Sequence, residues 1–221
     1  MPKNRILSRL SRADYALIEP HLEVVDLPVR KVLQPRNKRV EQVYFPESGI
    51  ASVVANGENT LEIGMIGREG MTGVSVVLGA DERAPHETYV QVAGLGQRLS
   101  AVHLLKAIEA SAALNKLLLH YAHTFMAQST QKALANGRHK IEERLARWLL
   151  MADDRLDGHE LALTQEFLGV MLGTARPGVT IAMQELERRG WITHRRGNVT
   201  ILDREGLEKA SAGAYVPPNN K

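Results

Sequence analysis

A change of sequence texture near residue 100 constrains the fold more than any other feature. From Leu22 to Leu99 short β-branched runs alternate with glycine-rich turns, and after Ser100 the patterns are helical. Short strands repeated about every 8 to 12 residues are typical of a β-barrel or roll. Strands are predicted over residues 24–32, 40–45, 50–54, 61–66, 74–78 and 88–92, with a tight hairpin turn at residues 56–57. We therefore expect a β-rich half followed by a helical half.

Two shorter segments flank or interrupt this β-rich half. A short helix is expected over residues 12–19, because Ser11 can cap it and Pro20 ends it. The segment from Gly67 to Gly73 superficially resembles a phosphate-binding glycine loop. Neither a Lys-Ser/Thr pair nor a dinucleotide fingerprint follows it, so glycines at the corners of a barrel are the preferred interpretation.

A long helix is predicted after the β-rich half. Ser100 begins a helix that ends at Ala110, and Ser111 caps a second one that runs to about residue 135, before Asn136-Gly137. One apolar stripe runs along the second helix and consists of Leu114, Leu118, Tyr121 and Phe125. Because the helix is apolar on more than one side, it should bury one side in its own domain and the other against a second copy. This predicts a homodimer with that stripe as the interface; the alternative is a helix wholly internal to the monomer.

The C-terminal third contains a helix-turn-helix pattern. A helix over residues 141–151 is followed by a short helix capped by Thr164, and Gly173 lies in a tight turn before a helix that starts at Arg176 and stops at Gly190. In this motif the N-terminal end of the second helix enters the DNA major groove. The outward positions of the second helix are Arg176, Thr180, Gln184 and Arg188.

A β-hairpin with a basic tip follows the second helix. Residues 191–194 and 198–202 alternate apolar and polar side chains around Arg195-Arg196-Gly197. A protruding pair of arginines suits the DNA backbone, and arginine also pairs with guanine O6 and N7. The predicted DNA contacts are therefore Thr174, Arg176, Thr180, Gln184, Arg188, Arg195, Arg196 and Asn198, with Thr174 on a phosphate.

Composition excludes several other classes. The 221 residues contain no cysteine, so disulfides, thiolate metal sites and Cys-ligated iron–sulfur clusters are chemically impossible. The net charge is only +3, but the arginines concentrate near the C-terminus. No stretch reaches the roughly 18 apolar residues of a spanning helix and none resembles a secretory signal, so we expect a cytoplasmic protein.

Residues 143–150 (ERLARWLL), 163–173 (LTQEFLGVMLG) and 184–192 (QELERRGWI) resemble the Crp/Fnr superfamily of bacterial transcription regulators. The resemblance covers nearly the whole chain. It implies an α+β fold with an N-terminal antiparallel β-roll like a cyclic-nucleotide-binding domain, a long dimerisation helix and a C-terminal winged helix. The expected boundaries are 1–110, 111–136 and 137–211, followed by a flexible tail over 212–221. Double-stranded DNA is the implied partner, and RNA polymerase is a further candidate.

The chain departs from the family pattern in two places. In the better-known members the recognition helix contains Arg-Glu-Thr-Val-Ser-Arg, whose Glu and second Arg read bases. Here Pro177 and Ile181 stand at those two positions, and of the charged residues in the run only Arg176 is kept. Cyclic-AMP binders carry a Gly-Glu-Leu-Ala-Leu cassette and an Arg-Ser/Thr pair; Val74 stands at the Glu position, and Arg83 is followed by Ala84. A cyclic phosphate would lose its charge-assisted contact, so no tight cyclic-AMP binding and no cofactor are expected.

Other functions receive less support from the sequence. His120 and His123 have a spacing that could present imidazoles to a metal or haem, but no third ligand is evident and surface positions are preferred. The usual motifs of acyl transfer, zinc hydrolysis and P-loop chemistry are absent, so an enzyme is not expected. The competing hypothesis is a signal-sensing adaptor whose winged helix binds protein.

Overall fold

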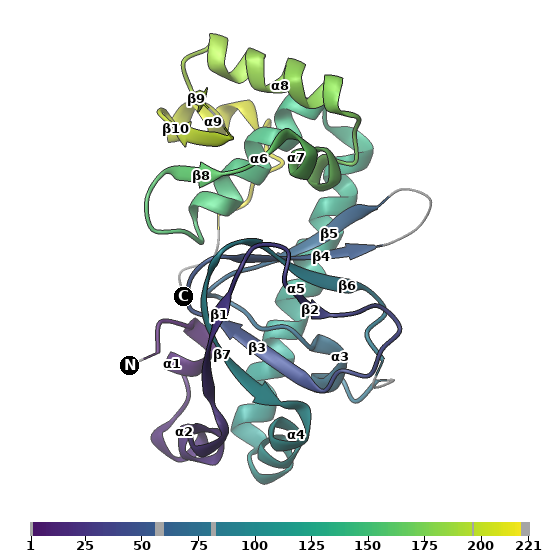
Figure 1. The fold of residues 1–221 in the computed structure, drawn as a ribbon, viewed down its shortest axis with the longest axis vertical. Helices are drawn as coiled ribbons and strands as arrows, with labels where there is room; N and C mark the ends of the chain where they lie inside the picture. The colour runs from purple at the N-terminus through teal and green to yellow at the C-terminus, as the bar shows by residue number, and fades with distance from the viewer. Residues whose placement is uncertain (1, 56–59, 81–82, 196, 218–221) are drawn as a thin grey trace. The chain divides into compact units, whose positions relative to one another are not determined.

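The computed structural model describes residues 2–55, 60–80, 83–195 and 197–217 (Figure 1). The chain divides into two compact units. Unit 1 comprises residues 1–56 and 64–129, and unit 2 comprises residues 57–63 and 130–221. None of the described helices is long and apolar enough to cross a membrane.

Unit 1 contains two antiparallel sheets, and apart from the pair β4-β5 their neighbouring strands are not consecutive in the chain. The first has the order β1-β7-β3, with β1 at Glu23–Leu27, β7 at Gly94–Ser100 and β3 at Gln42–Pro46. The second has the order β2-β6-β4-β5, with β2 at Val32–Gln34, β6 at Glu87–Val92, β4 at Ile50–Ala55 and β5 at Leu61–Ile66. Only the second half of β5, from Gly64, is counted with unit 1. The expected roll is thus present, and the predicted turn at residues 56–57 lies outside the described residues.

Two predicted strands of unit 1 are wrong. The run over 24–32 is two strands, because the chain turns at Arg30 with a positive φ of 69°. The run over 74–78 is instead the short helix α3 (Val74–Val77). It follows Gly73 at a φ of 85°, a conformation that β-branched residues avoid, and it buries Val76 and Val77 in the core. Core packing thus decides against the strand preference of valine.

The remaining helices of unit 1 begin where the sequence places capping side chains. Helix α2 (Arg12–Ile18) has Ser11 as its N-cap, and α4 (Ala101–Ala110) has Ser100. The Ser111 hydroxyl accepts from the Leu114 N–H at 3.1 Å near the start of α5 (Ala112–Arg138). Three elements of unit 1 were not predicted: the short helices α1 (Arg5–Ser8) and η1 (Glu19–His21) and the strand β7 at Gly94–Ser100.

Helix α5 differs from its prediction in length and in the face it buries. It continues through Asn136-Gly137 without a break, and the two units divide at residues 129 and 130 instead of 136 and 137. Leu114, Leu118 and Tyr121 lie in the core of unit 1. The Tyr121 hydroxyl also donates to the Met71 carbonyl at 2.8 Å.

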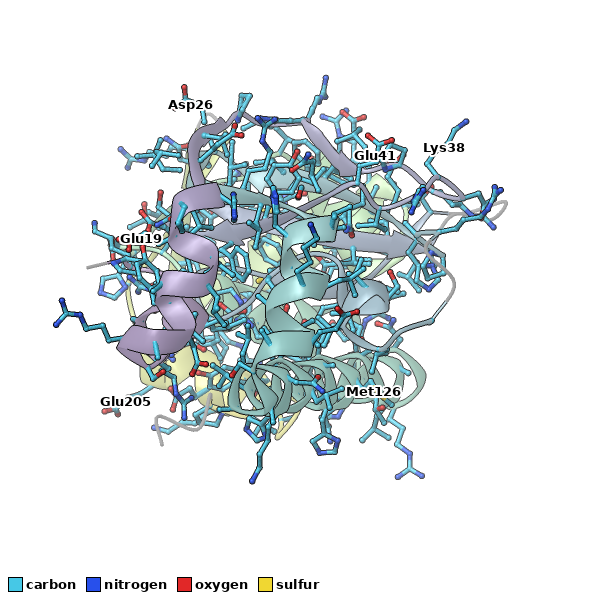
Figure 2. The ribbon with its side chains drawn as sticks, turned by 90° about the horizontal axis from the view of Figure 1, so that it is seen from below. Glu19, Asp26, Lys38, Glu41, Met126 and Glu205 are labelled. Atoms are coloured by element: carbon cyan, nitrogen blue, oxygen red, sulfur yellow. The ribbon has the colours of Figure 1, made fainter. Side chains whose placement is uncertain are left out.

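The stripe assigned to a dimer interface therefore packs inside the monomer. Leu114 and Leu118 are 1% and 0% exposed, so a second copy cannot reach them. Phe125 is half-buried and packs against the same core, over Gly64 of β5. A different, exposed side of α5 carries Leu119 and Met126, which are 41% and 59% exposed, and Figure 2 labels Met126 on this helix. The sequence pattern was correct about two apolar sides, but the assignment of the stripe to the interface was wrong.

Unit 2 packs helices against a small antiparallel sheet. The helices are α6 (Ile141–Asp153), α7 (Gln165–Leu172), α8 (Arg176–Arg188) and α9 (Arg204–Ala210). The sheet has the order β8-β10-β9, with β8 at Glu160–Ala162, β10 at Asn198–Ile201 and β9 at Ile192–Arg195. The hairpin β9-β10 was predicted and β8 was not. Trp148 of α6 is 1% exposed and is the largest fully buried side chain.

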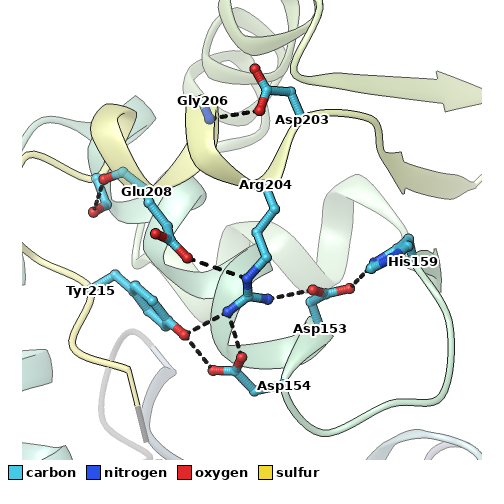
Figure 3. A network of polar contacts seen from close by, with 9 residues as sticks. Asp153, Asp154, His159, Asp203, Arg204, Gly206, Glu208 and Tyr215 are labelled. Carbon is cyan, nitrogen blue, oxygen red and sulfur yellow. Dashed lines mark hydrogen bonds and ion pairs between the residues drawn. The ribbon is translucent and has the colours of Figure 1, made fainter.

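Residues 214 and 215 are buried in unit 2, so this part of the predicted tail over 212–221 is packed instead of flexible. Ala214 and Tyr215 are 6% and 8% exposed. Arg204 bonds Asp154 and the Tyr215 hydroxyl, both at 2.7 Å, and also contacts Asp153 (Figure 3). Burial would lower the pKa of Arg204, but the hydrogen bonds and charges of Asp154 and Asp153 outweigh it and raise that pKa. Residues 218–221 lie outside the described residues.

Candidate nucleic-acid interface

Helices α7 and α8 form a helix-turn-helix whose turn is set by local chemistry. The Thr164 hydroxyl accepts from the Phe167 N–H at 3.3 Å and so caps α7. Gly173 ends α7 at a φ of 58°, and a Cβ there would lie 2.6 Å from the Leu61 side chain. The Leu61 atom is the end of a flexible side chain that can move aside, so it is the positive φ that favours glycine here. Arg176 and Pro177 are the first residues of α8, as predicted.

Helix α8 separates cleanly into a buried and an exposed side. Val179, Ala182, Met183 and Leu186 are at most 3% exposed and hold the helix on unit 2. The outward line of exposed residues is Pro177, Ile181, Gln184 and Arg188, with Arg176 beside it. Three of the predicted contacts, Arg176, Gln184 and Arg188, are thus exposed. Thr174 and Thr180 are half-buried.

Arg176 is held in position by a residue that the sequence analysis did not select. Its Nε–H donates to the Gln165 Oε1 at 3.2 Å, and the Thr180 hydroxyl donates to the same oxygen at 3.3 Å. The single hydroxyl hydrogen of Thr180 is shared with a second acceptor, the Arg176 carbonyl, at 3.1 Å. Because the Nε–H points to Gln165, the two terminal amino groups of the guanidinium are left as the outward fork. Such a fork matches two acceptors in one plane.

Arg188, by contrast, is engaged on its own helix. Its Nε and Nη2 each donate to the Glu185 carboxylate at 3.0 Å, and Arg189 donates to the same carboxylate at 2.6 Å. The hydrogen bonds from Arg188 and Arg189 lower the pKa of Glu185 to about 2. Part of the positive charge at the C-terminal end of α8 is therefore neutralised internally, which the sequence analysis did not anticipate.

The wing is fixed to α8 by a carboxylate. Glu187 accepts from the backbone N–H of His194 at 2.9 Å and so ties strand β9 to the helix. Arg195 and Asn198 are exposed at the end of the hairpin, as expected, and Arg196 lies outside the described residues. An open cleft of about 390 Å³ lies between the wing and the starts of α7 and α8. Its lining residues are Thr164, Gln165, Glu166, Arg176, His194 and Gly197.

Sequence reasoning missed Gln165, Ile181 and Glu187. Gln165 was visible only as part of a family-like run, and nothing in its spacing indicates a bond to Arg176. Ile181 was noted only as a departure from that pattern. Among the described residues, no group of three or more His, Asp or Glu side chains is arranged to hold a metal ion.

Comparisons with known proteins agree with this architecture. Residues 143–210 match the family model of the Crp-like helix-turn-helix domain. No curated protein sequence matches the chain. FixK2 from Bradyrhizobium japonicum superposes with a TM-score of 0.73 at 16% identity, over 87% of this chain and 98% of that one.

Two further structures have the same fold. One, from Eubacterium rectale, is described as a transcriptional regulator of the Crp/Fnr family and superposes with a TM-score of 0.74 at 17% identity, over 96% and 100% of the chains. The other, the c-di-GMP responsive global regulator CLP from Xanthomonas campestris, has a TM-score of 0.66 at 16% identity, over 86% and 99%. At such low identities these likenesses establish the fold alone. The chain thus has the fold of the Crp/Fnr transcription regulators, with a Crp-like helix-turn-helix domain at residues 143–210.

Proposed function

We propose that this protein is a transcription regulator that binds double-stranded DNA as a homodimer at a pseudo-palindromic operator. One observation carries the proposal: the start of α8 is exposed and presents Arg176, whose guanidinium is oriented outward by Gln165. A wing with exposed Arg195 lies next to it. An exposed helix of this kind fits the major groove, and the wing arginine suits the phosphate backbone.

The proposed dimer uses the exposed side of α5. Leu119 and Met126 are seven residues apart, so they lie on one side of the helix, and Ala112 and Ala133 continue the line. A second copy of the chain is the occupant that a palindromic operator requires, because each half-site needs its own α8. The two half-sites should then lie about one helical turn, ~34 Å, apart. Met126→Glu should shift the dimer toward monomer in sedimentation.

Control by cyclic AMP is not part of the proposal. The side chains of α5 that face unit 1 already bond the protein itself: Tyr121 binds the Met71 carbonyl, and the Gln128 amide pairs with both backbone groups of Met65, at 2.7 and 3.1 Å. Val74 offers no carboxylate, and Arg83 is exposed and donates to the Asn37 carbonyl. A micromolar or tighter dissociation constant for cyclic AMP by calorimetry would refute this part.

The test is in vitro selection of bound duplexes with no added small molecule, followed by salt titration. A symmetric motif with half-sites one turn apart supports the proposal. Arg176→Ala should then weaken operator binding by about 1–3 kcal/mol and reduce the sequence preference of the protein at one base pair. Arg195→Ala should weaken binding to all sequences alike and reduce the salt slope by about one. If no duplex is enriched at low salt, a winged helix that binds protein becomes the better interpretation.

A further inference from the structure

An apolar side chain lies in the middle of the outward side of α8. Ile181 is 68% exposed, although its neighbours on the helix, Val179 and Ala182, are buried. Pro177, one turn earlier, is also exposed. Arg176 and Gln184 lie on either side of this pair along the helix, and both can form hydrogen bonds. An aliphatic side chain is thus held in water among hydrogen-bonding groups on the surface that the proposed function places against DNA.

The helix geometry brings Ile181 close to base edges. Residues rise by about 1.5 Å along an α-helix, so Ile181 is about 6 Å from Pro177 and about 4.5 Å from Gln184 along the axis. Base pairs repeat every 3.4 Å or so, and the first turns of such a helix reach deepest into the major groove. Ile181 would therefore face a base pair one or two steps from the one that Arg176 contacts.

Only one group in the major groove suits an aliphatic side chain. Guanine, adenine and cytosine present donors and acceptors there, and isoleucine would remove water from them without replacing their hydrogen bonds. Thymine presents a C5 methyl group, and 5-methylcytosine carries the same methyl at the same carbon. Contact with this methyl buries apolar surface on both partners.

We propose that Ile181, with Pro177 beside it, selects a C5-methylated pyrimidine in each half-site, thymine in unmodified DNA. The inference rests on the proposed DNA-binding function and adds the chemistry of one operator position. It also explains why this surface has a hydrocarbon where a polar side chain would be better hydrated.

The test replaces single thymines of the selected operator by uracil, which lacks only the methyl group. Loss of one buried methyl should weaken wild-type binding about fourfold, and replacement in both half-sites about fifteenfold. Uracil in place of thymine should not change the affinity of the Ile181→Ala variant, whereas the Ile181→Val variant should show most of the loss of affinity seen with the wild type. Leu202→Ala is the matched control, because Leu202 is a 61% exposed aliphatic residue outside α8. This variant should respond to uracil as the wild type does.

The outcomes separate the inference from the function on which it rests. If uracil is tolerated at every thymine of a bound operator, or if Ile181→Ala suffers the same penalty, the methyl-reading role is wrong and DNA binding stands. If no duplex is bound, the proposed function itself fails. A second set of duplexes carries cytosine or 5-methylcytosine at the same position. Tighter binding of the duplex with 5-methylcytosine than of the duplex with cytosine, without any loss on replacement of thymine by uracil, would identify methylated DNA as the source of the methyl group.

Discussion

A buried ion pair in unit 2 allows the sharpest stability prediction. Glu62 and Lys132 are 2% and 7% exposed, and the Lys132 ammonium donates to the Glu62 carboxylate at 3.1 Å and to the Met171 carbonyl at 2.6 Å. The Trp148 indole N–H donates to the same Glu62 oxygen at 3.1 Å. Burial lowers the pKa of Lys132, and the Glu62 charge opposes that shift. The pair thus joins β5 to α5, and its further hydrogen bonds reach Trp148 of α6 and Met171 in the last turn of α7.

Glu62→Leu leaves the Lys132 charge buried without its counter-ion and the Trp148 N–H without an acceptor. Breaking a buried pair on one side costs about 3–5 kcal/mol of unfolding free energy. A unit of about 100 residues loses about 4–8 °C of Tm per kcal/mol, so unit 2 should melt on the order of 20 °C lower. Scanning calorimetry measures this change, and near-ultraviolet circular dichroism reports the packing of Trp148.

The double variant Glu62→Leu/Lys132→Met is the control, because removing both charges from a buried site is often neutral or stabilising. It should regain most of the stability that Glu62→Leu loses. A double variant as unstable as the single one would show that packing, and not the unpaired charge, sets the cost. A single variant within about 1 kcal/mol of the wild type would refute the argument altogether.

Three further predictions concern the DNA-facing side. Gln165→Ala should weaken operator binding by about 0.5–1.5 kcal/mol and reduce the base preference at the base pair that Arg176 contacts. In an Arg176→Ala background the same change should cause no additional loss of affinity. Equal losses in both backgrounds would rule out coupling between the two residues. Because the pKa of Glu185 is lowered to about 2, its carboxylate stays charged and keeps its ion pairs at any pH above the usual carboxyl pKa. These ion pairs are lost only as the pH falls toward 2. Titration of Glu185 should therefore not affect DNA binding between about pH 5 and 8. Glu185→Gln should release two guanidinium groups and steepen the salt dependence by about one to two; an unchanged slope would show that they do not reach phosphate.

Local signals were sufficient where a short segment determines its own conformation. Ser11, Ser100 and Thr164 cap helices as their sequence context predicts, because the cap bond forms within three residues. Gly173 turns the chain between α7 and α8 for a reason equally local, its positive φ. The helix-turn-helix and the wing hairpin could be read from the sequence on these grounds.

The same local reasoning failed where packing overrides propensity. Residues 74–78 have the composition of a strand, yet they form α3, because two valines of that helix enter the core of unit 1. Asn136-Gly137 has the composition of a break, yet α5 continues through it. Arg204 and Tyr215 are fixed within unit 2 by contacts with Asp153 and Asp154, which lie about 50 to 60 residues earlier.

The sequence by itself determined the order of elements and the apolar sides of each helix. Only the tertiary structure decided what covers each side. Periodicity shows that a helix has an apolar stripe, but it carries no information about the partner, so Leu114 and Leu118 were assigned to a dimer although they belong to the monomer core. Likewise, the alternation of buried residues placed α8 correctly, but the bond from Arg176 to Gln165 joins residues on two helices. Contacts between elements depend on how the chain returns on itself, and only the folded coordinates contain that information.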